Sequence, residues 1–326
     1  MSFFKRITHA TSVAVLLAGV CLSQPASAEN KKAVLSQAFQ SMLYLPLYVG
    51  IDKGFFTDQG LDLTKETAGA PSVALSAVIS GSAQFSLHGP EWTAIAASKG
   101  APVDIIANVV NGAAVWIATT PDFKFESVKD LKGQKIVTGL MPTTSTSLFM
   151  KLLKENGIDP KTDVELIQVA LGTEPGPFLA KQADVAVMYE PGLDQVVAKG
   201  MKVALGFPKA YGPYAFSAIS ARADVDPDIA QRLVSGLEMA IRFIATHQDE
   251  TVEIARKEFP NLDPAVVEAA VRRMITEKVY PSSVDITAEA LKTGMDTQIA
   301  LGNLAKQPDY DAFVVRKYIE PALAIK

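Results

Sequence analysis

The chain has 326 residues, of which 48% are hydrophobic and 20% charged, and it carries a formal net charge of −4. This composition is typical of a compact folded protein and excludes a disordered chain. The mildly acidic balance argues against binding to nucleic acid or to an anionic membrane surface. The length predicts two lobes rather than one hydrophobic core.

The N-terminus has the features of a secretory signal peptide. Lys5 and Arg6 precede an apolar run from Val13 to Leu22, and Ala26-Ser27-Ala28 supplies the small residues of a cleavage site. The apolar run is too short for a stable membrane span. We therefore expect residues 1–28 to be removed and the mature protein to work in the periplasm.

Two alternatives for this segment stay open. One is a membrane anchor that is retained, and the other is lipidation at Cys21, which follows Val20. A lipoprotein signal would need a small residue before the cysteine, and valine is a poor one. Because Cys21 is the chain's only cysteine, cleavage after Ala28 leaves neither disulfides nor thiolate chemistry.

The first predicted elements form a βαβ unit. The apolar run Ala33–Phe39 predicts a strand, and Pro46 begins a predicted helix that extends to Phe56. Gly54 and Gly60 then mark a turn into a second strand that begins near Leu61.

The same alternation continues along the chain. Hydrophobic patterning predicts strands separated by helices, an arrangement that builds a mostly parallel sheet covered on both faces. The further predicted strands are Leu61–Glu66, Gln84–Leu87, Val103–Val110, Lys135–Thr138, Val164–Gln168, Val185–Tyr189 and Val203–Phe207. The helices between them are predicted at Ser72–Ser80, Pro90–Ser98, Ser145–Glu155, Pro177–Lys181 and Gly192–Lys199. Beyond Asp226 the pattern is helical, with helices predicted at Ile229–Thr246, Thr251–Glu258, Pro264–Thr276, Ala288–Ala300 and Tyr310–Tyr318.

Two extended segments divide this series into lobes. Val115–Thr119 and Ala215–Ile219 are apolar, rich in small residues and flank the second group of strands. If both are crossover strands, residues 29–116 and 217–326 form one lobe and residues 117–216 the other. Two strands that join two α/β lobes make a hinge with a cleft between the carboxyl ends of the sheets. A single large α/β domain is the alternative.

The segment from Tyr44 to Leu63 carries a family resemblance. Its proline at the helix start, followed by Gly-Phe-Phe and Gly-Leu-Asp-Leu, resembles the nitrate/sulfonate/taurine and thiamine-pyrimidine family of solute-binding proteins. The pattern Ala-Asp-x-Ala…Glu-Pro around residues 183–191 is a second match. The resemblance covers nearly the whole mature chain. It implies a class II periplasmic-binding-protein fold, a small-molecule solute, and an ABC permease with its ATPase as partners.

Ligand contacts are expected in loops that follow strand ends, where helix N-termini present free N–H groups. Before the helix at Pro46, Tyr44 is a candidate that could equally pack on the neighbouring helix. After the next strand, Gly89, Glu91 and Trp92 match by position the ligand contacts that the resemblance implies. Glu91 could instead only complement the helix dipole.

Two further loops supply the remaining candidates. Thr143, Thr144 and Ser145 belong to a hydroxyl-rich run before a predicted helix, where they could cap the helix or hold a polar group. Tyr189 and Glu190 end a strand, and Pro191 biases Glu190 toward an extended conformation that projects into the cleft. Tyr214, like Tyr211, could wall the cleft or only pack beside it. Glu174 is a weaker candidate for which solvent exposure is the alternative, and His88 is expected to be structural.

The residue types in these loops indicate the chemical class of the ligand. No arginine occurs between Glu29 and Ala221, although the guanidinium group is the best planar match to nitrate or a sulfonate. Carboxylates with aromatic walls suit a neutral or cationic heteroaromatic or an amine-bearing solute. The sequence therefore favours a pyrimidine-like or aminated ligand and leaves a zwitterion such as taurine open.

The function expected from these features is solute binding without catalysis, by a monomer that needs no cofactor. A periplasmic sensor subunit that docks on a receptor kinase would use the same cleft and stays an alternative. An enzyme of thiamine-pyrimidine biosynthesis is a third reading, but its iron-associated cysteine-rich motif is absent. His88 and His247 lack the spacing of metal ligands.

Overall fold

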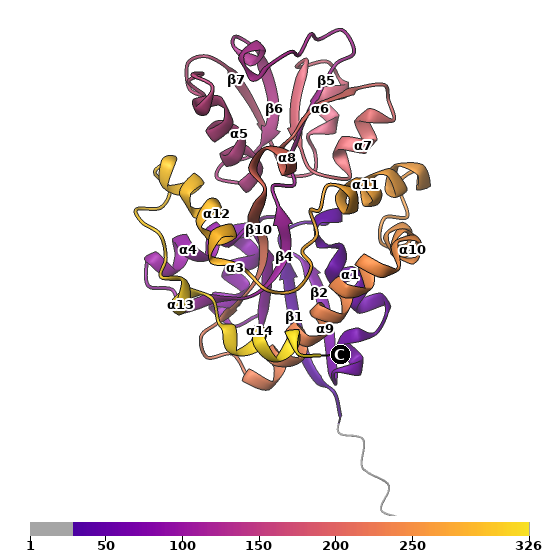
Figure 1. Ribbon diagram of the computed structural model, residues 1–326, viewed down its shortest axis with the longest axis vertical. Helices are drawn as coiled ribbons and strands as arrows, with labels where there is room; N and C mark the ends of the chain where they lie inside the picture. The colour runs from indigo at the N-terminus through magenta and orange to yellow at the C-terminus, as the bar shows by residue number, and fades with distance from the viewer. Residues whose placement is uncertain (1–28, 326) are drawn as a thin grey trace, which may run out of the picture.

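The computed structural model describes residues 29–325 and consists of two α/β lobes, one above the other (Figure 1). The expected signal peptide, with Cys21 and Ala28, lies outside the described residues. Within residues 29–325, the helices are too short or too polar to cross a membrane.

The first lobe is built on a mixed five-stranded sheet with the order β2-β1-β3-β10-β4. Its strands are β1 (Lys31–Gln37), β2 (Leu61–Thr67), β3 (Phe85–His88), β4 (Val103–Gly112) and β10 (Pro213–Arg222). β1 pairs in parallel with β2 and β3, whereas β10 returns antiparallel between β3 and β4. The carboxyl ends of β1 and β3 therefore lie at one edge of the sheet, which faces the second lobe.

The second lobe repeats this plan with the order β7-β6-β8-β5-β9. Its strands are β5 (Trp116–Thr119), β6 (Lys135–Gly139), β7 (Glu165–Val169), β8 (Val185–Met188) and β9 (Lys202–Gly206). β6 pairs in parallel with β7 and β8, and β5 is antiparallel to β8 and β9. The alternation of strands and helices thus produces the two predicted α/β sheets.

Helices cover both sheets (Figure 1). The first lobe begins with a 3-10 turn, η1, and four helices: η1 (Met42–Tyr44), α1 (Leu45–Asp52), α2 (Phe55–Asp58), α3 (Pro71–Ser80) and α4 (Pro90–Ser98). The second lobe has η2 (Val128–Leu131), α5 (Thr144–Glu155), α6 (Pro175–Leu179), α7 (Gly192–Val197) and α8 (Phe207–Tyr211). The C-terminal helices are α9 (Pro227–Thr246), α10 (Gln248–Glu258), α11 (Pro264–Thr276), α12 (Ala288–Ala300), α13 (Tyr310–Phe313) and α14 (Arg316–Leu323).

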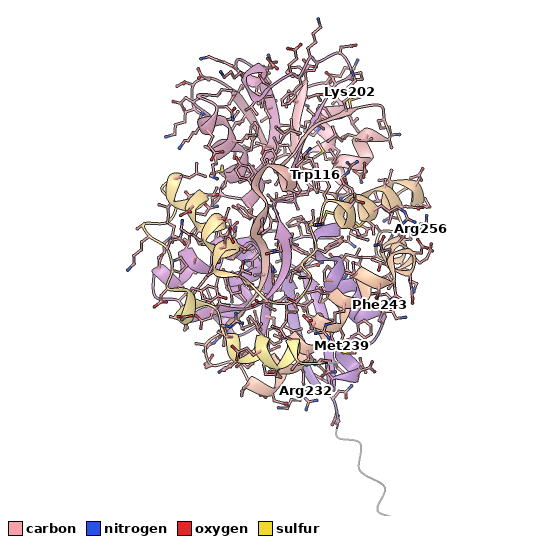
Figure 2. All side chains as sticks on the ribbon, viewed as in Figure 1. Trp116, Lys202, Arg232, Met239, Phe243 and Arg256 are labelled. Carbon is pink, nitrogen blue, oxygen red and sulfur yellow. The ribbon has the colours of Figure 1, made fainter. Side chains whose placement is uncertain are left out.

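The chain passes between the lobes twice, through short connections. Residues 113–115 join β4 to β5, and residues 207–212 join β9 to β10. Each of the two segments proposed as crossover strands therefore belongs to one sheet only, because Trp116 pairs with Met188 while Ser217 pairs with Val110. Figure 2 shows Trp116 at the narrow junction of the lobes. The predicted boundaries of the moving bodies, at residues 116/117 and 216/217, stay a prediction.

Two helices predicted as continuous are interrupted. The predicted helix Pro46–Phe56 ends at Asp52, because Gly54 adopts a left-handed conformation with φ of 75° before α2 begins. The predicted helix Tyr310–Tyr318 breaks where Val314 forms a parallel bridge with Ile105, and the Val315 N–H donates to the Ile105 carbonyl at 2.9 Å. Pairing with the edge strand β4 takes precedence there over helix propensity.

Two glycines allow α1 and α9 to approach the ring of Phe56. A Cβ placed on Gly50 would lie 2.5 Å from this ring, and one on Gly236 would lie 2.6 Å from it. Phe56 is only 2% exposed, so the ring has little space into which it could move. We expect Gly236→Ala to lower the free energy of unfolding by about 1–3 kcal/mol through overpacking. Urea unfolding would check this, with Gly176→Ala in α6 as the control, because a Cβ at Gly176 has no atom within 4 Å and needs no left-handed backbone. Equal losses in the two variants would contradict the packing argument.

Candidate functional site

A small cavity lies between the two lobes, where strand-end loops of both sheets meet. Its volume is only about 10 Å³, so the two walls lie almost against each other. Its lining consists of Phe39, Leu43, Tyr44, Pro71, Gly89, Thr143, Thr144, Leu171, Tyr189, Phe216 and Ser217. The structure therefore brings five of the predicted site residues to one cavity wall: Tyr44, Gly89, Thr143, Thr144 and Tyr189.

Sheet topology explains this convergence. Gly89 follows β3, Thr143 and Thr144 follow β6, and Tyr189 follows β8. The carboxyl ends of parallel strands lie at the same edge of a sheet, and in this protein the two edges face each other. Residues far apart in sequence thus reach one space.

Glu91 lies directly behind this wall. Its side chain is 3% exposed, and the Thr144 hydroxyl donates a hydrogen bond of 2.5 Å to Oε1 from the other lobe. Burial raises the pKa of Glu91 to about 7, although the bond from Thr144 acts in the opposite direction. A Cβ on Gly89 would lie 2.3 Å from Oε2 of Glu91. Gly89 is therefore required for the carboxyl group to sit this close to the backbone.

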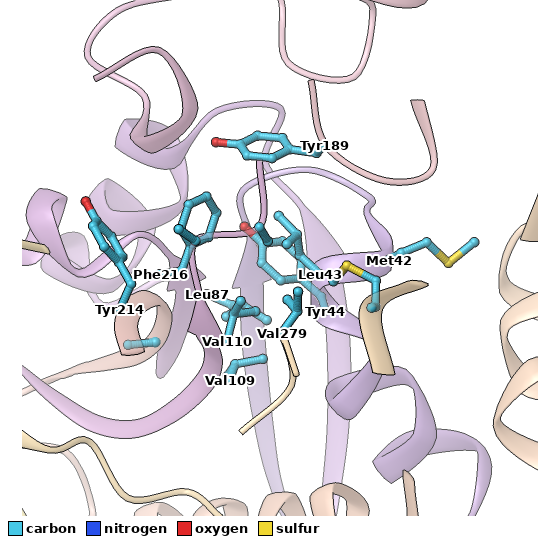
Figure 3. Packing of buried hydrophobic residues seen from close by; sticks show 14 of the residues in the cluster. Met42, Leu43, Tyr44, Leu87, Val109, Val110, Tyr189, Tyr214, Phe216 and Val279 are labelled. Carbon is cyan, nitrogen blue, oxygen red and sulfur yellow. The ribbon is translucent and has the colours of Figure 1, made fainter. Parts of the chain in front are cut away.

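Aromatic rings form much of the remaining wall. Tyr189 stacks on Phe39 from the other lobe, with ring centroids 5.7 Å apart and planes at 20°. It also meets Phe216 edge to face at 5.7 Å. Figure 3 shows the rings of Tyr44, Tyr189 and Phe216 in one group, with Tyr214 beside Phe216. Walls of this kind suit a planar or apolar portion of a ligand.

Some residues of the hydroxyl-rich loop 143–146 line the cavity, and others form hydrogen bonds that stabilise the local fold. Thr143 and Thr144 line the cavity. The Ser145 backbone N–H donates to the Tyr189 hydroxyl at 2.9 Å, which orients the tyrosine ring. Thr146 instead donates to the Gly139 carbonyl at 2.7 Å. The excess of hydroxyl groups thus serves both the cavity wall and the local fold.

Besides Glu91 and Ser145, three predicted site residues do not line this cavity. Trp92 packs against a separate apolar cluster of the first lobe that includes Leu75 and Val78. Tyr214 packs against Phe216 with ring centroids 5.8 Å apart. Glu190 is fully buried at the junction of the lobes, where its carboxylate contacts Arg273.

Arg273 connects the two lobes. From α11 it donates to Glu190 Oε1 at 2.8 Å and to Asp194 Oδ1 at 2.6 Å, and both carboxylates belong to the second lobe. Burial raises the pKa of Glu190 well above its usual range, and the nearby charge of Asp194 adds to this effect. The Ser41 hydroxyl further joins the lobes by donating to the Glu190 carbonyl at 2.8 Å.

Sequence reasoning missed this arginine. The cleft loops contain none, as expected, but Arg273 reaches the junction from the helical C-terminal region. Its guanidinium is already bound by two carboxylates, so it is not available as a free oxyanion site. Phe39 and Phe216 were also missed, and their aromatic character next to strand ends was the only signal that could have indicated them.

Glu174 is buried, so the solvent-exposed alternative for this residue is wrong. It is 1% exposed, and its Oε1 has no hydrogen-bond partner in residues 29–325. Burial raises the pKa of Glu174 to about 7. The carboxyl group lies against cavity-lining residues of the second lobe.

Two other residues have structural surroundings. His88 is fully buried, its ring nitrogens contact Ser86 and the Gly89 carbonyl at 2.9 Å, and burial lowers its pKa to about 4. Tyr211 lies outside the cavity and donates to Glu155 at 2.7 Å. The described residues contain no cluster of three or more His, Cys, Asp or Glu side chains suited to a metal ion.

One protein family is identified by comparison of this sequence with known protein families. The family model described as "NMT1/THI5 like" matches residues 42–251. The protein YtlA of Bacillus subtilis (strain 168) is 23% identical over 306 residues, which cover 90% of this chain and 91% of YtlA.

Solved structures share the two-lobed fold. The aliphatic sulphonate binding protein SsuA from Escherichia coli matches with a TM-score of 0.72 and 14% identity, covering 89% of this chain and 99% of SsuA. The nitrate-binding protein NrtA from Synechocystis PCC 6803 matches with a TM-score of 0.73 and 16% identity, covering 90% and 88% of the two chains. The desulfurization enzyme DSZB also matches, with a TM-score of 0.67 and 12% identity, covering 89% of this chain and 99% of the enzyme. The fold therefore occurs both in binding proteins and in an enzyme.

Proposed function

Because the chain belongs to the NMT1/THI5-like family, we propose that it is the periplasmic solute-binding component of an ABC importer. As a monomer it captures a small organic solute of the pyrimidine-like, sulfonate or taurine class between its lobes. It then delivers the solute to a membrane permease that is driven by an ATPase. No catalytic step is part of this function.

One observation carries the proposal. The cavity wall comes from both lobes, and the bond from Thr144 to Glu91 crosses between them. A solute that enters this space when the lobes separate would therefore contact both of them at once and hold them together. Since the connections between the lobes are short, such binding favours a hinge motion over local loop rearrangement.

A thermal-shift screen of the purified protein tests the function. Pyrimidines, sulfonates, taurine, nitrate and aromatic acids would be compared. A true solute at 100 times its dissociation constant should stabilise the folded state by about 2.7 kcal/mol. If every class leaves the melting temperature unchanged, the proposal fails. Conversion of a bound solute into a product would favour an enzyme instead.

The variant Thr144→Val tests the location of the site. It removes the hydroxyl group that joins the lobes while keeping a β-branched side chain of similar size. A lost hydrogen bond of about 1–1.5 kcal/mol would weaken solute binding by about tenfold. Isothermal titration calorimetry would measure the dissociation constant.

The matched control is Thr246→Val, at an exposed position near the end of α9. Its dissociation constant should equal that of the unaltered protein. Equal affinities for both valine variants would place the solute outside this cavity.

A further inference from the structure

We propose that the solute carries two hydrogen-bond-donating or cationic groups, one bound by Glu91 of the first lobe and the other by Glu174 of the second. The proposal rests on the proposed function and specifies the chemistry of the solute. Glu174 thereby becomes a determinant of specificity, in addition to the residues that line the cavity.

A comparison among buried carboxylates supports this assignment. The buried acidic side chains of residues 29–325 are Glu91, Glu174, Glu190, Asp194 and Glu238. Glu190 and Asp194 pair with Arg273, and Glu238 pairs with Arg242 at 2.7 Å. Glu91 and Glu174 form no salt bridge within the described part of the chain, where the bond from Thr144 is the one side-chain hydrogen bond to either. A buried carboxylate is costly without a cation or a full set of donors.

These two carboxyl groups come from different lobes, and each lies close to residues that line the cavity. Oε1 of Glu174 and Oγ1 of Thr143 would both lie within 3.4 Å of a Cβ placed on Gly139, and Leu171 would contact the same Cβ. Thr143 and Leu171 both line the cavity. Glu174 therefore lies at the wall formed by the second lobe, whereas Glu91 lies behind Gly89 of the first lobe.

Tyr189 lies near both carboxyl groups. Burial raises the pKa of its hydroxyl group, and the charges of both Glu91 and Glu174 contribute to the increase. The stacked pair of Tyr189 and Phe39 provides an apolar surface near both carboxyl groups. A short or planar solute with a donor group at each end could bind the carboxyl groups of Glu91 and Glu174 at the same time. Its binding would hold the two lobes together.

Matched probes test this chemistry by isothermal titration calorimetry on the full protein. Benzamidine carries one cationic group on a ring, and 4-(aminomethyl)benzamidine carries a second at the opposite end. Benzenesulfonate is the anionic counterpart of similar shape. We expect the doubly charged probe to bind about tenfold or more tightly than benzamidine, and benzenesulfonate to bind weakest.

The variant Glu174→Gln should remove the difference between the two cationic probes and leave the affinity for benzamidine within about twofold. The control variant Glu126→Gln alters an exposed carboxylate of the same lobe, and it should keep the full difference. Glu91→Gln is the second test variant, and it should also reduce the difference. Circular dichroism and thermal melting of each variant would confirm that the fold is retained.

Three outcomes would overturn the inference. The first is that the two cationic probes bind with equal affinity, and the second is that neither binds. The third is that Glu174→Gln lowers the affinity for both probes by the same factor. Binding of a sulfonate or nitrate in the cavity without binding of a cation would overturn the inference and leave the proposed function in place. If no solute class binds at all, the proposed function itself fails.

Discussion

The variant Arg273→Met is expected to destabilise the closed arrangement of the lobes by about 3–5 kcal/mol. It would leave the carboxylates of Glu190 and Asp194 buried without their cation, since both lie at the junction and are at most 3% exposed. Separation of the lobes would return these carboxylates to water. We therefore expect an increased radius of gyration in small-angle X-ray scattering and a large loss of solute affinity.

The adjacent residue supplies a matched control. Arg272 on the same helix pairs with Glu268 and Asp249, but all three side chains are substantially exposed. Exposed ion pairs contribute about 0–1 kcal/mol, so Arg272→Met should change neither the scattering profile nor the affinity appreciably. Adding Glu190→Gln and Asp194→Asn to Arg273→Met should restore most of the solute affinity and of the stability of the closed arrangement, because no buried carboxylate is then left without its cation. Identical behaviour of the two single methionine variants would show that Arg273 does not hold the lobes together.

The second large effect concerns pH. The pKa values of Glu91 and Glu174 are raised from 4.5 to about 7 by burial, so the folded protein retains protons that the unfolded chain releases between these values. The contribution of these groups to the free energy of unfolding therefore falls as pH rises from about 4.5 to 7, and is constant above that range. The expected loss is roughly 3 kcal/mol for each carboxyl group.

Comparison with a double variant isolates this contribution. His88 acts in the opposite direction, because its pKa is lowered from 6.5 to about 4 and its protonation destabilises the folded protein as pH falls. Urea unfolding at several pH values should therefore be measured for the natural protein and for Glu91→Gln/Glu174→Gln. The stability difference between the two should shift by several kcal/mol across this pH range in favour of the variant. A difference independent of pH would mean that the carboxyl groups are hydrated in the folded state.

Local patterns in the sequence were sufficient to predict the two sheets and several residues of the cavity. Gly89, Thr144 and Tyr189 each follow a strand with clear hydrophobic patterning, and topology then requires them to converge. The position of Trp92 was less secure, because adjacent residues on a helix point about 100° apart. Glu91 and Trp92 therefore face different directions, and Trp92 joins Ala96, one turn later, on the apolar side.

The remaining site residues depend on contacts that no local pattern specifies. Arg273 and Glu190 are separated by 83 positions, and they meet only because α11 packs against η1 of the first lobe and α7 of the second. The burial of Glu174 likewise depends on how its loop packs against the end of β6. A single sequence contains no periodic signal for such pairings.

A crystal structure of the protein with the solute that stabilises it most would test the central claim most directly. We expect electron density for that solute between the lobes, in contact with Tyr44, Thr144 and Tyr189. A second cavity of about 500 Å³ lies elsewhere at the junction and is lined by residues that include Pro208, Ile241 and Ile244. Solute density in that second cavity, with the space beside Tyr189 empty, would contradict the account.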